Sequence, residues 1–297
     1  MTIRHYRKDD IPAMRALWQR VFNEREAYLD AVFALLPDIG GAAVATDENG
    51  VLIGAAYAMT GFELLTNGRE GPHVGYIYAV AVDESVRGRG IGAALTRAAA
   101  EICREREAVI ITTLPAEDSL YPWYEKQIGT NCLLYLEKRT VSARKTLDIM
   151  KLTGTEYMLW RENMLRGKAH IRLSTPMMEA QRALCEAYDG GLYASSDGIF
   201  AAFRDGEQLI ILEVLCVQGS PEETAASAAA YLNCREAVYY MPAEGPDVTS
   251  GTSLTPDAKK EPGVYSVTPT VSDRVIEPYV VSDTPLPPGT VWNLTLD

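Results

Sequence analysis

A glycine-rich hinge between an apolar strand and an alanine-rich helix constrains this chain more than any other feature. Residues 76–82 are almost entirely apolar, and residues 91–106 carry apolar side chains at helical spacing. The hinge Arg87-Gly88-Arg89-Gly90-Ile91-Gly92 leads into the helix N-terminus, where backbone N–H groups are unpaired and the helix dipole supplies about half a positive charge. Such a terminus suits a phosphate group, and the arginines add cationic donors. The sequence therefore predicts a phosphate-bearing ligand at the hinge.

The elements around the hinge alternate in a way typical of an α/β domain. The first half reads as strand, two helices, three strands, helix, strand, short helix and strand, and its Asn49-Gly50 pair is a strong hairpin signal. The expected strands are residues 2–7, 41–47, 51–65, 76–82, 109–114 and 132–136, and the expected helices begin at Asp9 and cover 26–36, 91–106 and 115–126. His73 is expected in the loop before the central strand.

The second half repeats part of this pattern. Expected strands are 169–174, 190–195, 199–204, 207–217 and 237–241, with helices at 177–188 and 221–232. Both halves have a Gly-Gly pair entering the second strand and a Pro-Ala-Glu after the last, which suggests duplication. The segment of the second half that corresponds to the hinge is, however, Gln218-Gly219-Ser220-Pro221-Glu222-Glu223. One glycine and two acids predict an ordinary capped helix start without a phosphate site.

Composition limits the classes of partner. The net charge of −12 argues against nucleic acid and is compatible with a cationic amine. No segment resembles a signal peptide or a membrane span, so we expect a cytoplasmic protein without membrane contact. The odd number and wide spacing of the cysteines favour buried free thiols over disulfides or metal ligands. They are Cys103, Cys132, Cys185, Cys216 and Cys234.

Two other phosphate-binding motifs fit the hinge less well. Gly88-x-Gly90-x-x-Ala93 matches a loose dinucleotide fingerprint, but residues 83–87 separate it from the strand, and no acid ends the next strand. The hinge has no Gly-Lys-Ser/Thr, so a P-loop is excluded. A glycine turn without a ligand stays open, although three glycines carry an entropic cost that needs a reason.

The hinge resembles the acetyl-CoA loop of the GNAT N-acetyltransferases. Val82-Asp83-x-x-x-Arg87-x-x-Gly90-x-Gly92 matches the family pattern Arg/Gln-x-x-Gly-x-Gly/Ala, and the first half follows the family's order of elements. The resemblance implies a GNAT fold with a central mixed sheet, acetyl-CoA as cosubstrate, no metal, and a strand amide that polarises the thioester carbonyl. The implied cofactor-binding residues are Arg87, Gly88, Arg89, Gly90, Ile91 and Gly92 at the pyrophosphate, and Val80, Ala81 and Val82 along the pantetheine arm.

A tyrosine after the next strand is the implied general acid. Tyr124-Glu125-Lys126 matches the core of the family's Leu-Tyr-Glu-Lys-x-Gly-Phe-like stretch, although Gly129 comes one residue late and Thr130 replaces the aromatic. Tyr124 would protonate the departing thiolate, whose pKa is about 8–9. Tyr121, on the same helical face, is the alternative, and a tyrosine that only packs in the core stays open.

The longer layout resembles the tandem enhanced-intracellular-survival type of acetyltransferase, in which a degenerate GNAT-like region follows the catalytic one. It implies a catalytic domain at 1–140 and a degenerate lobe at 141–297, which includes an irregular segment at 245–275, a recovered pattern at 275–281 and a terminal strand from Val291. About fifty residues after the second lobe are too few for a further full domain. By the same resemblance the carboxyl terminus at Asp297 reaches the active site, against the alternative of a solvated chain end.

The function expected from these features is acetyl transfer from acetyl-CoA to a small-molecule or peptide amine by direct attack. No general base stands out: Glu63, His73 and Glu213 are candidates by residue type alone. The alternative is a non-catalytic acyl-CoA-binding sensor whose second lobe is an interaction surface. The oligomeric state is open, with a homo-oligomer possible.

Overall fold

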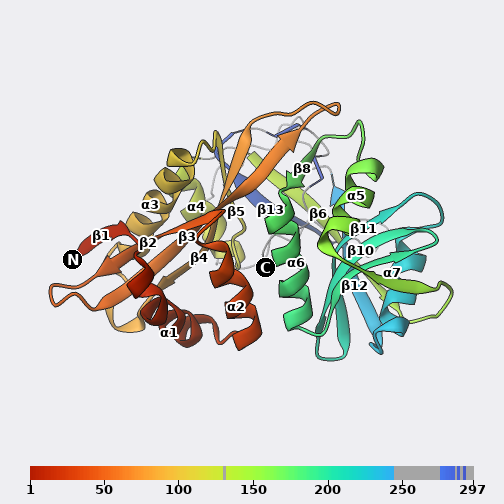
Figure 1. The fold of residues 1–297 in the computed structure, drawn as a ribbon, viewed down its shortest axis with the longest axis horizontal. Helices are drawn as coiled ribbons and strands as arrows, with labels where there is room; N and C mark the ends of the chain where they lie inside the picture. Colours follow the sequence, from red (N-terminus) through yellow and green to blue (C-terminus); the bar gives the residue numbers. More distant parts are fainter. Residues whose placement is uncertain (130–131, 244–274, 285, 288–289, 292–297) are drawn as a thin grey trace, which may run out of the picture.

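The computed structural model describes residues 1–129, 132–243, 275–284, 286–287 and 290–291 (Figure 1). The helices are α1 (Ile11–Phe22), α2 (Glu26–Leu35), α3 (Ile91–Glu105), α4 (Tyr121–Ile128), α5 (Gly154–Met164), α6 (Thr175–Ala187) and α7 (Pro221–Tyr231). The strands are β1 (Thr2–His5), β2 (Gly40–Thr46), β3 (Leu52–Leu65), β4 (His73–Val82), β5 (Ile110–Thr113), β6 (Cys132–Ser142), β7 (Ile149–Leu152), β8 (His170–Leu173), β9 (Gly191–Ser195), β10 (Gly198–Asp205), β11 (Gln208–Cys216), β12 (Glu236–Ala243) and β13 (Val275–Ser282).

The predicted α/β class and the order of elements are confirmed, with three corrections. His73 lies in β4, opposite Glu63 of β3, and not in a loop. The strand β7 and the helix α5 were not predicted, because α5 has apolar residues around its circumference and no clear apolar stripe. A capping box does mark the start of α5: the Thr153 hydroxyl accepts from the Glu156 N–H, and the Glu156 carboxylate accepts from the Thr153 N–H.

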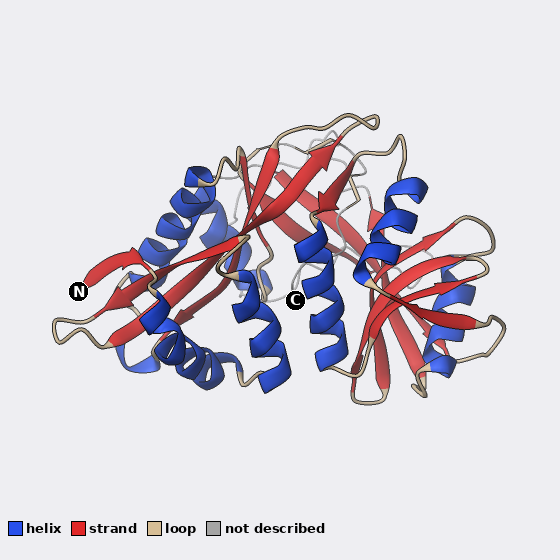
Figure 2. Cartoon of the chain, viewed as in Figure 1, coloured by secondary structure: helices blue, strands red, loops and turns tan. Residues whose placement is uncertain are grey.

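One sheet runs through both halves of the molecule. Within the described residues its thirteen strands follow the order β1-β2-β3-β4-β5-β13-β6-β12-β11-β10-β9-β7, with β8 paired to β3 (Figure 2). The late strand β13 lies between β5 and β6 and is antiparallel to both. The other edge of β6 pairs with β12 of the second half. A segment from beyond residue 270 therefore joins the two halves of the sheet.

The two halves share one topology. In the first, the antiparallel strands β2, β3 and β4 are followed by α3 and by β5, which is parallel to β4. In the second, the antiparallel strands β9, β10 and β11 are followed by α7 and by β12, which is parallel to β11. Both central strands carry a bulge, between Tyr78 and Ala81 in β4 and between Ile211 and Glu213 in β11. The sequence repeat therefore corresponds to a structural repeat.

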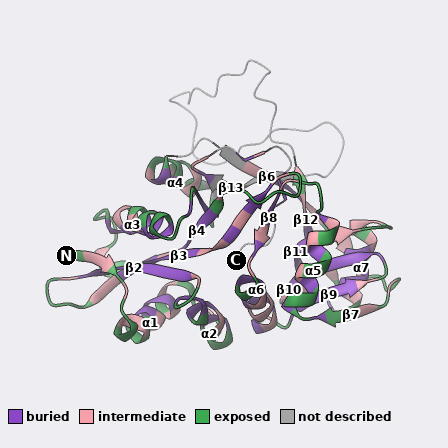
Figure 3. Ribbon diagram, turned by 45° about the horizontal axis from the view of Figure 1, so that its top comes forward, coloured by how far each residue is buried: buried purple, intermediate pink, exposed green. Residues whose placement is uncertain are grey.

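Helices cover both faces of the first half's sheet. On one face α3 packs closely, because Gly75 leaves room for it: a Cβ there would stand 2.5 Å from Cys103 Cβ. On the opposite face α1 and α2 bury Trp18 against Tyr57 of β3, with ring centroids 4.7 Å apart. Figure 3 shows the buried strands between these layers. The helix α2 also packs against α6, and β8 pairs with β3, so further contacts join the halves (Figure 1).

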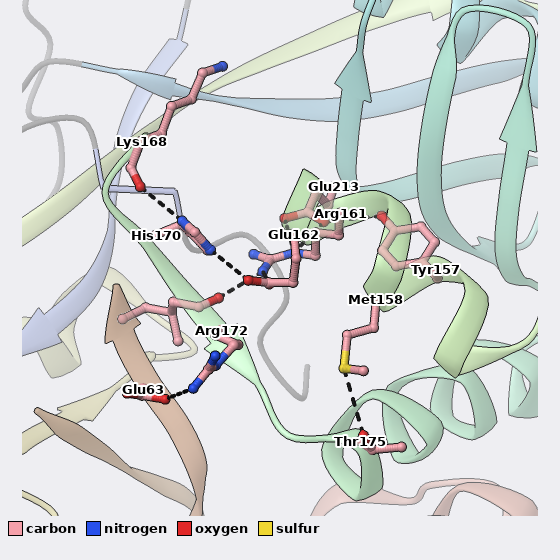
Figure 4. A network of polar contacts seen from close by, with 11 residues as sticks. Glu63, Tyr157, Met158, Arg161, Glu162, Lys168, His170, Arg172, Thr175 and Glu213 are labelled. Atoms are coloured by element: carbon pink, nitrogen blue, oxygen red, sulfur yellow. Dashed lines mark hydrogen bonds and ion pairs between the residues drawn. The ribbon is translucent and has the colours of Figure 1, made fainter. Parts of the chain in front are cut away.

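A buried ion pair fixes α5 to the second half of the sheet (Figure 4). Arg161 and Glu213 are both fully buried, and Arg161 Nε donates to Glu213 Oε2 over 2.9 Å. The Tyr157 hydroxyl donates to the same carboxylate over 3.1 Å, and Arg161 Nη1 donates to the Ile171 carbonyl over 2.9 Å. Burial, together with the charge of Glu213, raises the pKa of Tyr157 far above its ordinary value. Glu213 is therefore a structural carboxylate held by two donors.

Removing both members of this pair should cost less than the two single removals add up to. Arg161→Met leaves the buried Glu213 carboxylate without its cation, and Glu213→Leu leaves the buried Arg161 with only the Glu162 carboxylate, 3.3 Å away, as its counterion, so each should lower the free energy of unfolding by about 3–5 kcal/mol. The double variant Arg161→Met/Glu213→Leu should lose clearly less than the sum of the two. Urea unfolding followed by circular dichroism measures all three, and strictly additive losses would contradict the coupling.

Candidate active site

The hinge adopts a conformation that needs glycine. Gly88 and Gly90 lie in the left-handed region, with φ of 77° and 76°. A Cβ at either position would meet nothing within 4 Å, so the backbone conformation, and not space, requires glycine here. The backbone is fixed at its start by Arg87, whose Nε donates to the Val82 carbonyl over 3.1 Å. These contacts place the exposed hinge directly before α3.

The N-terminus of α3 has no side-chain cap. Its N-cap residue is Gly90, and its first turn holds no acidic residue. The corresponding helix α7 differs, because Ser220 Oγ accepts from the Glu223 N–H over 3.1 Å and two glutamates stand in the first turn. The first N–H groups of α3 are thus available to an external anion, whereas α7 already has an internal acceptor and repels negative charge.

The strands β4 and β5 separate beside the hinge. Their parallel pairing ends at Ile77 and Thr113. Past this point β4 bulges, with Ala79 in the left-handed region at a φ of 47°. The edge of β4 from Tyr78 onward therefore lacks a partner in β5, and its peptide groups border open space.

A cavity of about 480 Å³ occupies this separation and extends to the second half. The first half contributes Trp18, Phe22, Glu24, Tyr28, Ile77, Tyr78, Ala79, Val80, Thr113, Leu114, Ala116, Leu120 and Tyr124. The second half contributes Gln181, Leu184, Cys185, Tyr188, Phe203 and Leu212. The walls are mainly aromatic and aliphatic, and Glu24 is the one charged side chain among these described lining residues. Cavities of this size and character hold small organic ligands.

Tyr124 lines the cavity, and Tyr121 is not among the lining residues. Tyr124 is 8% exposed. The ring of its neighbour Trp123 packs against the Tyr124 ring, with the two centroids 4.8 Å apart, and Trp123 also lies beside Gly92 of α3. Gly129 ends α4 in the left-handed conformation, which explains its position one residue later than the family stretch. Helix α4 is therefore anchored to the start of α3, and Tyr124 borders the separated strands.

The other cofactor-binding residues predicted from the sequence lie in one continuous path. Val80 lines the cavity, Ala81 is buried, and Val82 lies near Gly92 at the start of α3. The strand β4 therefore leads from the cavity to the hinge.

The candidate bases lie away from this cavity. Glu63 pairs with Arg172, and both line a second cavity of about 540 Å³ together with His73. Glu213 is sealed in its ion pair. Asp297 lies outside the described residues. Glu24, Gln181 and Tyr188 were not found from the sequence, because they meet only when α6 of the second half packs beside the turn after α1.

The cysteine in the cavity wall is a neutral thiol. Cys185 is 1% exposed, and burial raises its pKa to about 12. Cys103, Cys185, Cys216 and Cys234 are free, as predicted, and the side chain of Cys132 lies outside the described part of the chain. A buried thiol of this kind is a poor nucleophile. The cavity therefore favours chemistry without a cysteine intermediate.

A comparison with family models gives a match in the first half of the chain. Residues 7–130 match the Acetyltransferase (GNAT) family. This region is a GNAT acetyltransferase domain. The match runs from just after β1 to the end of α4 and so includes the hinge, the bulged strand and Tyr124, which confirms the predicted resemblance. Among the curated proteins none matches the chain.

Solved structures resemble the chain beyond the GNAT domain. One is a conserved protein of unknown function from Enterococcus faecalis V583, described as a probable N-acyltransferase. It is 13% identical with a TM-score of 0.64, and the match covers 95% of this chain and 71% of that protein's chain. A GCN5-related N-acetyltransferase from Kribbella flavida is 15% identical with a TM-score of 0.58, covering 94% and 71%. Eis1 from Mycobacterium abscessus is 14% identical with a TM-score of 0.50, covering 80% and 65%. At such identities the likeness shows the fold.

The described residues offer neither a metal-binding cluster nor a membrane-spanning helix. No group of three or more His, Cys, Asp or Glu side chains there could hold a metal ion. None of the described helices is both long and apolar enough to cross a membrane.

The raised pKa of Cys185 predicts resistance to alkylation. With a pKa of about 12, only about one thiol in ten thousand is ionised at pH 8. Iodoacetamide at pH 8 should therefore leave Cys185 unmodified in the native protein and modify it after denaturation in urea. Mass spectrometry of the peptides measures both, and native labelling as fast as that of free cysteine would contradict the assigned burial.

Proposed function

We propose that the chain transfers the acetyl group of acetyl-CoA to an amine in the cavity between β4 and β5. The observation that carries this proposal is the convergence of three features at one place: the uncapped α3 with its glycine hinge, the unpaired edge of β4, and Tyr124. Each suits one part of an acetyl-CoA molecule, namely its pyrophosphate, its thioester and its sulfur. The GNAT domain supports the same chemistry.

The hinge residues fit the pyrophosphate of coenzyme A. Backbone N–H groups of residues 88–92 would donate to its oxygens, since the Arg87 N–H already donates to the Glu84 carbonyl over 3.3 Å, and the α3 dipole would add a favourable field. Val80, Ala81 and Val82 would flank the pantetheine arm, which ends at the bulge of β4. An N–H at the edge of β4 would then face the thioester carbonyl, where a well-placed donor contributes roughly 3–4 kcal/mol to the transition state.

Acetyl transfer would then be direct. The amine, deprotonated to a neutral nucleophile, attacks the thioester carbonyl carbon, so that a C–N bond forms and the C–S bond breaks. The nitrogen gives up its remaining excess proton to solvent, and the leaving thiolate takes a proton from the Tyr124 hydroxyl, which solvent restores. Much of the acceleration would come from holding both reactants in one cavity.

We further propose a division of roles along the chain. Residues 1–140 would form the catalytic domain, and residues 141–297 a degenerate lobe that supplies the far wall of the cavity through α6. The capped and acidic start of α7 supports a single coenzyme site in each chain.

Tyr124→Phe should slow acetyl transfer without changing the binding of acetyl-CoA. Loss of the proton donor should lower kcat about 10²–10⁴-fold, while the affinity for acetyl-CoA holds. Tyr121→Phe, one helical turn away and outside the cavity wall, is the matched control and should keep kcat within about twofold. Thiol release from acetyl-CoA over an amine panel measures kcat, and calorimetry measures affinity. Equal turnover of Tyr124→Phe and wild type would reject the assignment.

The same assay tests the sensor alternative. Acetyl-CoA binding without thiol release for every amine would favour a non-catalytic module, and no binding at all would reject both functions.

Gly90→Ala should weaken coenzyme binding through backbone strain. A non-glycine residue in the left-handed conformation costs roughly 1–2 kcal/mol, so the Kd for coenzyme A should rise about 5–30-fold. Gly68→Ala is the matched control, because Gly68 also has a positive φ, of 72°, and open space around it, but lies in the β3–β4 turn. Calorimetry with coenzyme A compares the two. An equal effect of both variants would show that the hinge is not the binding element.

A further inference from the structure

The cavity also contains a polar corner that the acetyl-transfer steps leave unused. It consists of Glu24 in the turn after α1, whose carboxylate accepts from the Tyr188 hydroxyl at the end of α6, and of Gln181 of α6, which lines the same cavity. We propose that this corner binds the ammonium group of the acceptor, and that the acceptor is a primary amine with one positive charge on an apolar or aromatic body. This inference rests on the proposed function and names its substrate class.

Glu24 supplies the negative charge. It forms no ion pair within the described part of the chain, and its carboxylate accepts a hydrogen bond from the Tyr188 hydroxyl. Burial, and then the bond to Glu24, raise the pKa of Tyr188, so that hydroxyl stays a donor. The neighbouring cation Arg25 is already engaged: its Nη1 lies 3.2 Å from Asp189 and donates to the Ala187 carbonyl over 2.9 Å. Glu24 therefore remains available to a cationic ligand.

Gln181 supplies a neutral acceptor that lacks a donor. Its side chain is 1% exposed, and its Oε1 is buried without a hydrogen-bond partner among the described residues. Its Nε2 lies 3.9 Å from Cys185 Sγ. An unpaired buried acceptor costs roughly 1–3 kcal/mol. An ammonium group has three donors and no acceptor, which matches both the carboxylate of Glu24 and the unpaired acceptor of Gln181.

Aromatic rings surround the corner and set the character of the rest of the ligand. Trp18 lies 5.5 Å from Tyr78 and 6.5 Å from Tyr28 between ring centroids, and Tyr28 lies 5.9 Å from Tyr188. These rings favour a flat or apolar body through burial of apolar surface. The buried Trp18 Nε1–H also lacks a partner in the described structure, so an acceptor atom on that body could pair with it.

The charge balance argues against polycations. Beyond Glu24, the described cavity wall offers no carboxylate, so a second ammonium on the ligand would be desolvated without a counterion. Polyamines and aminoglycosides carry several such groups. The net negative charge of the chain is thus not concentrated at the cavity, whose described wall carries a single carboxylate.

An amine panel with two variants tests this assignment. The wild-type protein with acetyl-CoA should release thiol with 2-phenylethylamine and n-hexylamine, with kcat/KM at least tenfold above that for spermidine or kanamycin. Glu24→Gln should raise KM for 2-phenylethylamine about 10–100-fold and leave KM for acetyl-CoA unchanged, since a hydrogen bond to a charged group is lost. Glu26→Gln, an exposed neighbour paired with Arg15, is the matched control and should change neither.

Gln181→Leu gives an independent readout from the second half. It should raise KM for 2-phenylethylamine about 3–10-fold, again without changing KM for acetyl-CoA, and circular dichroism checks that it folds. Preference for spermidine or kanamycin, or an unchanged KM in Glu24→Gln, would overturn the assigned acceptor and leave the acetyltransferase proposal standing. Thiol release with none of the four amines, in a protein that binds acetyl-CoA, would overturn the acceptor and count against the catalytic function.

Discussion

The separation of two parallel strands is the constraint on which the rest of this structure depends. Once pairing between β4 and β5 stops at Ile77 and Thr113, each strand must find other neighbours. The bulge at Ala79 turns the β4 edge toward open space, and α4 returns after β5 to close one side with Tyr124. The hinge follows at the end of the same strand. Cavity, hinge and tyrosine thus lie together at the place where the pairing of two strands ends.

In the second half the same topology forms a sealed, packed core instead of a cavity. Its bulged strand β11 also loses its parallel partner, after Ile211. The residue that follows the bulge, Glu213, is covered by Arg161 and Tyr157 of α5 and is fully buried. The corresponding helix start is capped by its own serine. One repeat therefore keeps an open site, and the other uses its equivalent positions for a sealed polar core.

The parts of the candidate site that could be proposed from the sequence are those that are local in the chain. Strand, hinge and helix stand consecutively, so glycine spacing and periodicity were enough to find them, and Tyr124 follows in a short recognisable stretch. Glu24 and Gln181 were not predicted because neither carries a local signal, and they line one cavity only because α6 packs against the first half, as its contact with α2 shows. The helix α5 was not predicted because its apolar residues form no stripe, although the capping box at its start is visible in the sequence. Pairing between distant strands, as with β13, likewise leaves no local trace.

The position of β13 has a consequence for how the molecule is made on the ribosome. The outer edge of β5 is covered by residues 281–282, and β6 is held from one side by residues 275–282. A nascent chain that has emerged only as far as α7 carries the hinge and Tyr124 but exposes unpaired strand edges. Such edges invite pairing with other chains. Completion of the sheet thus depends on contacts of long sequence separation, which form slowly and late.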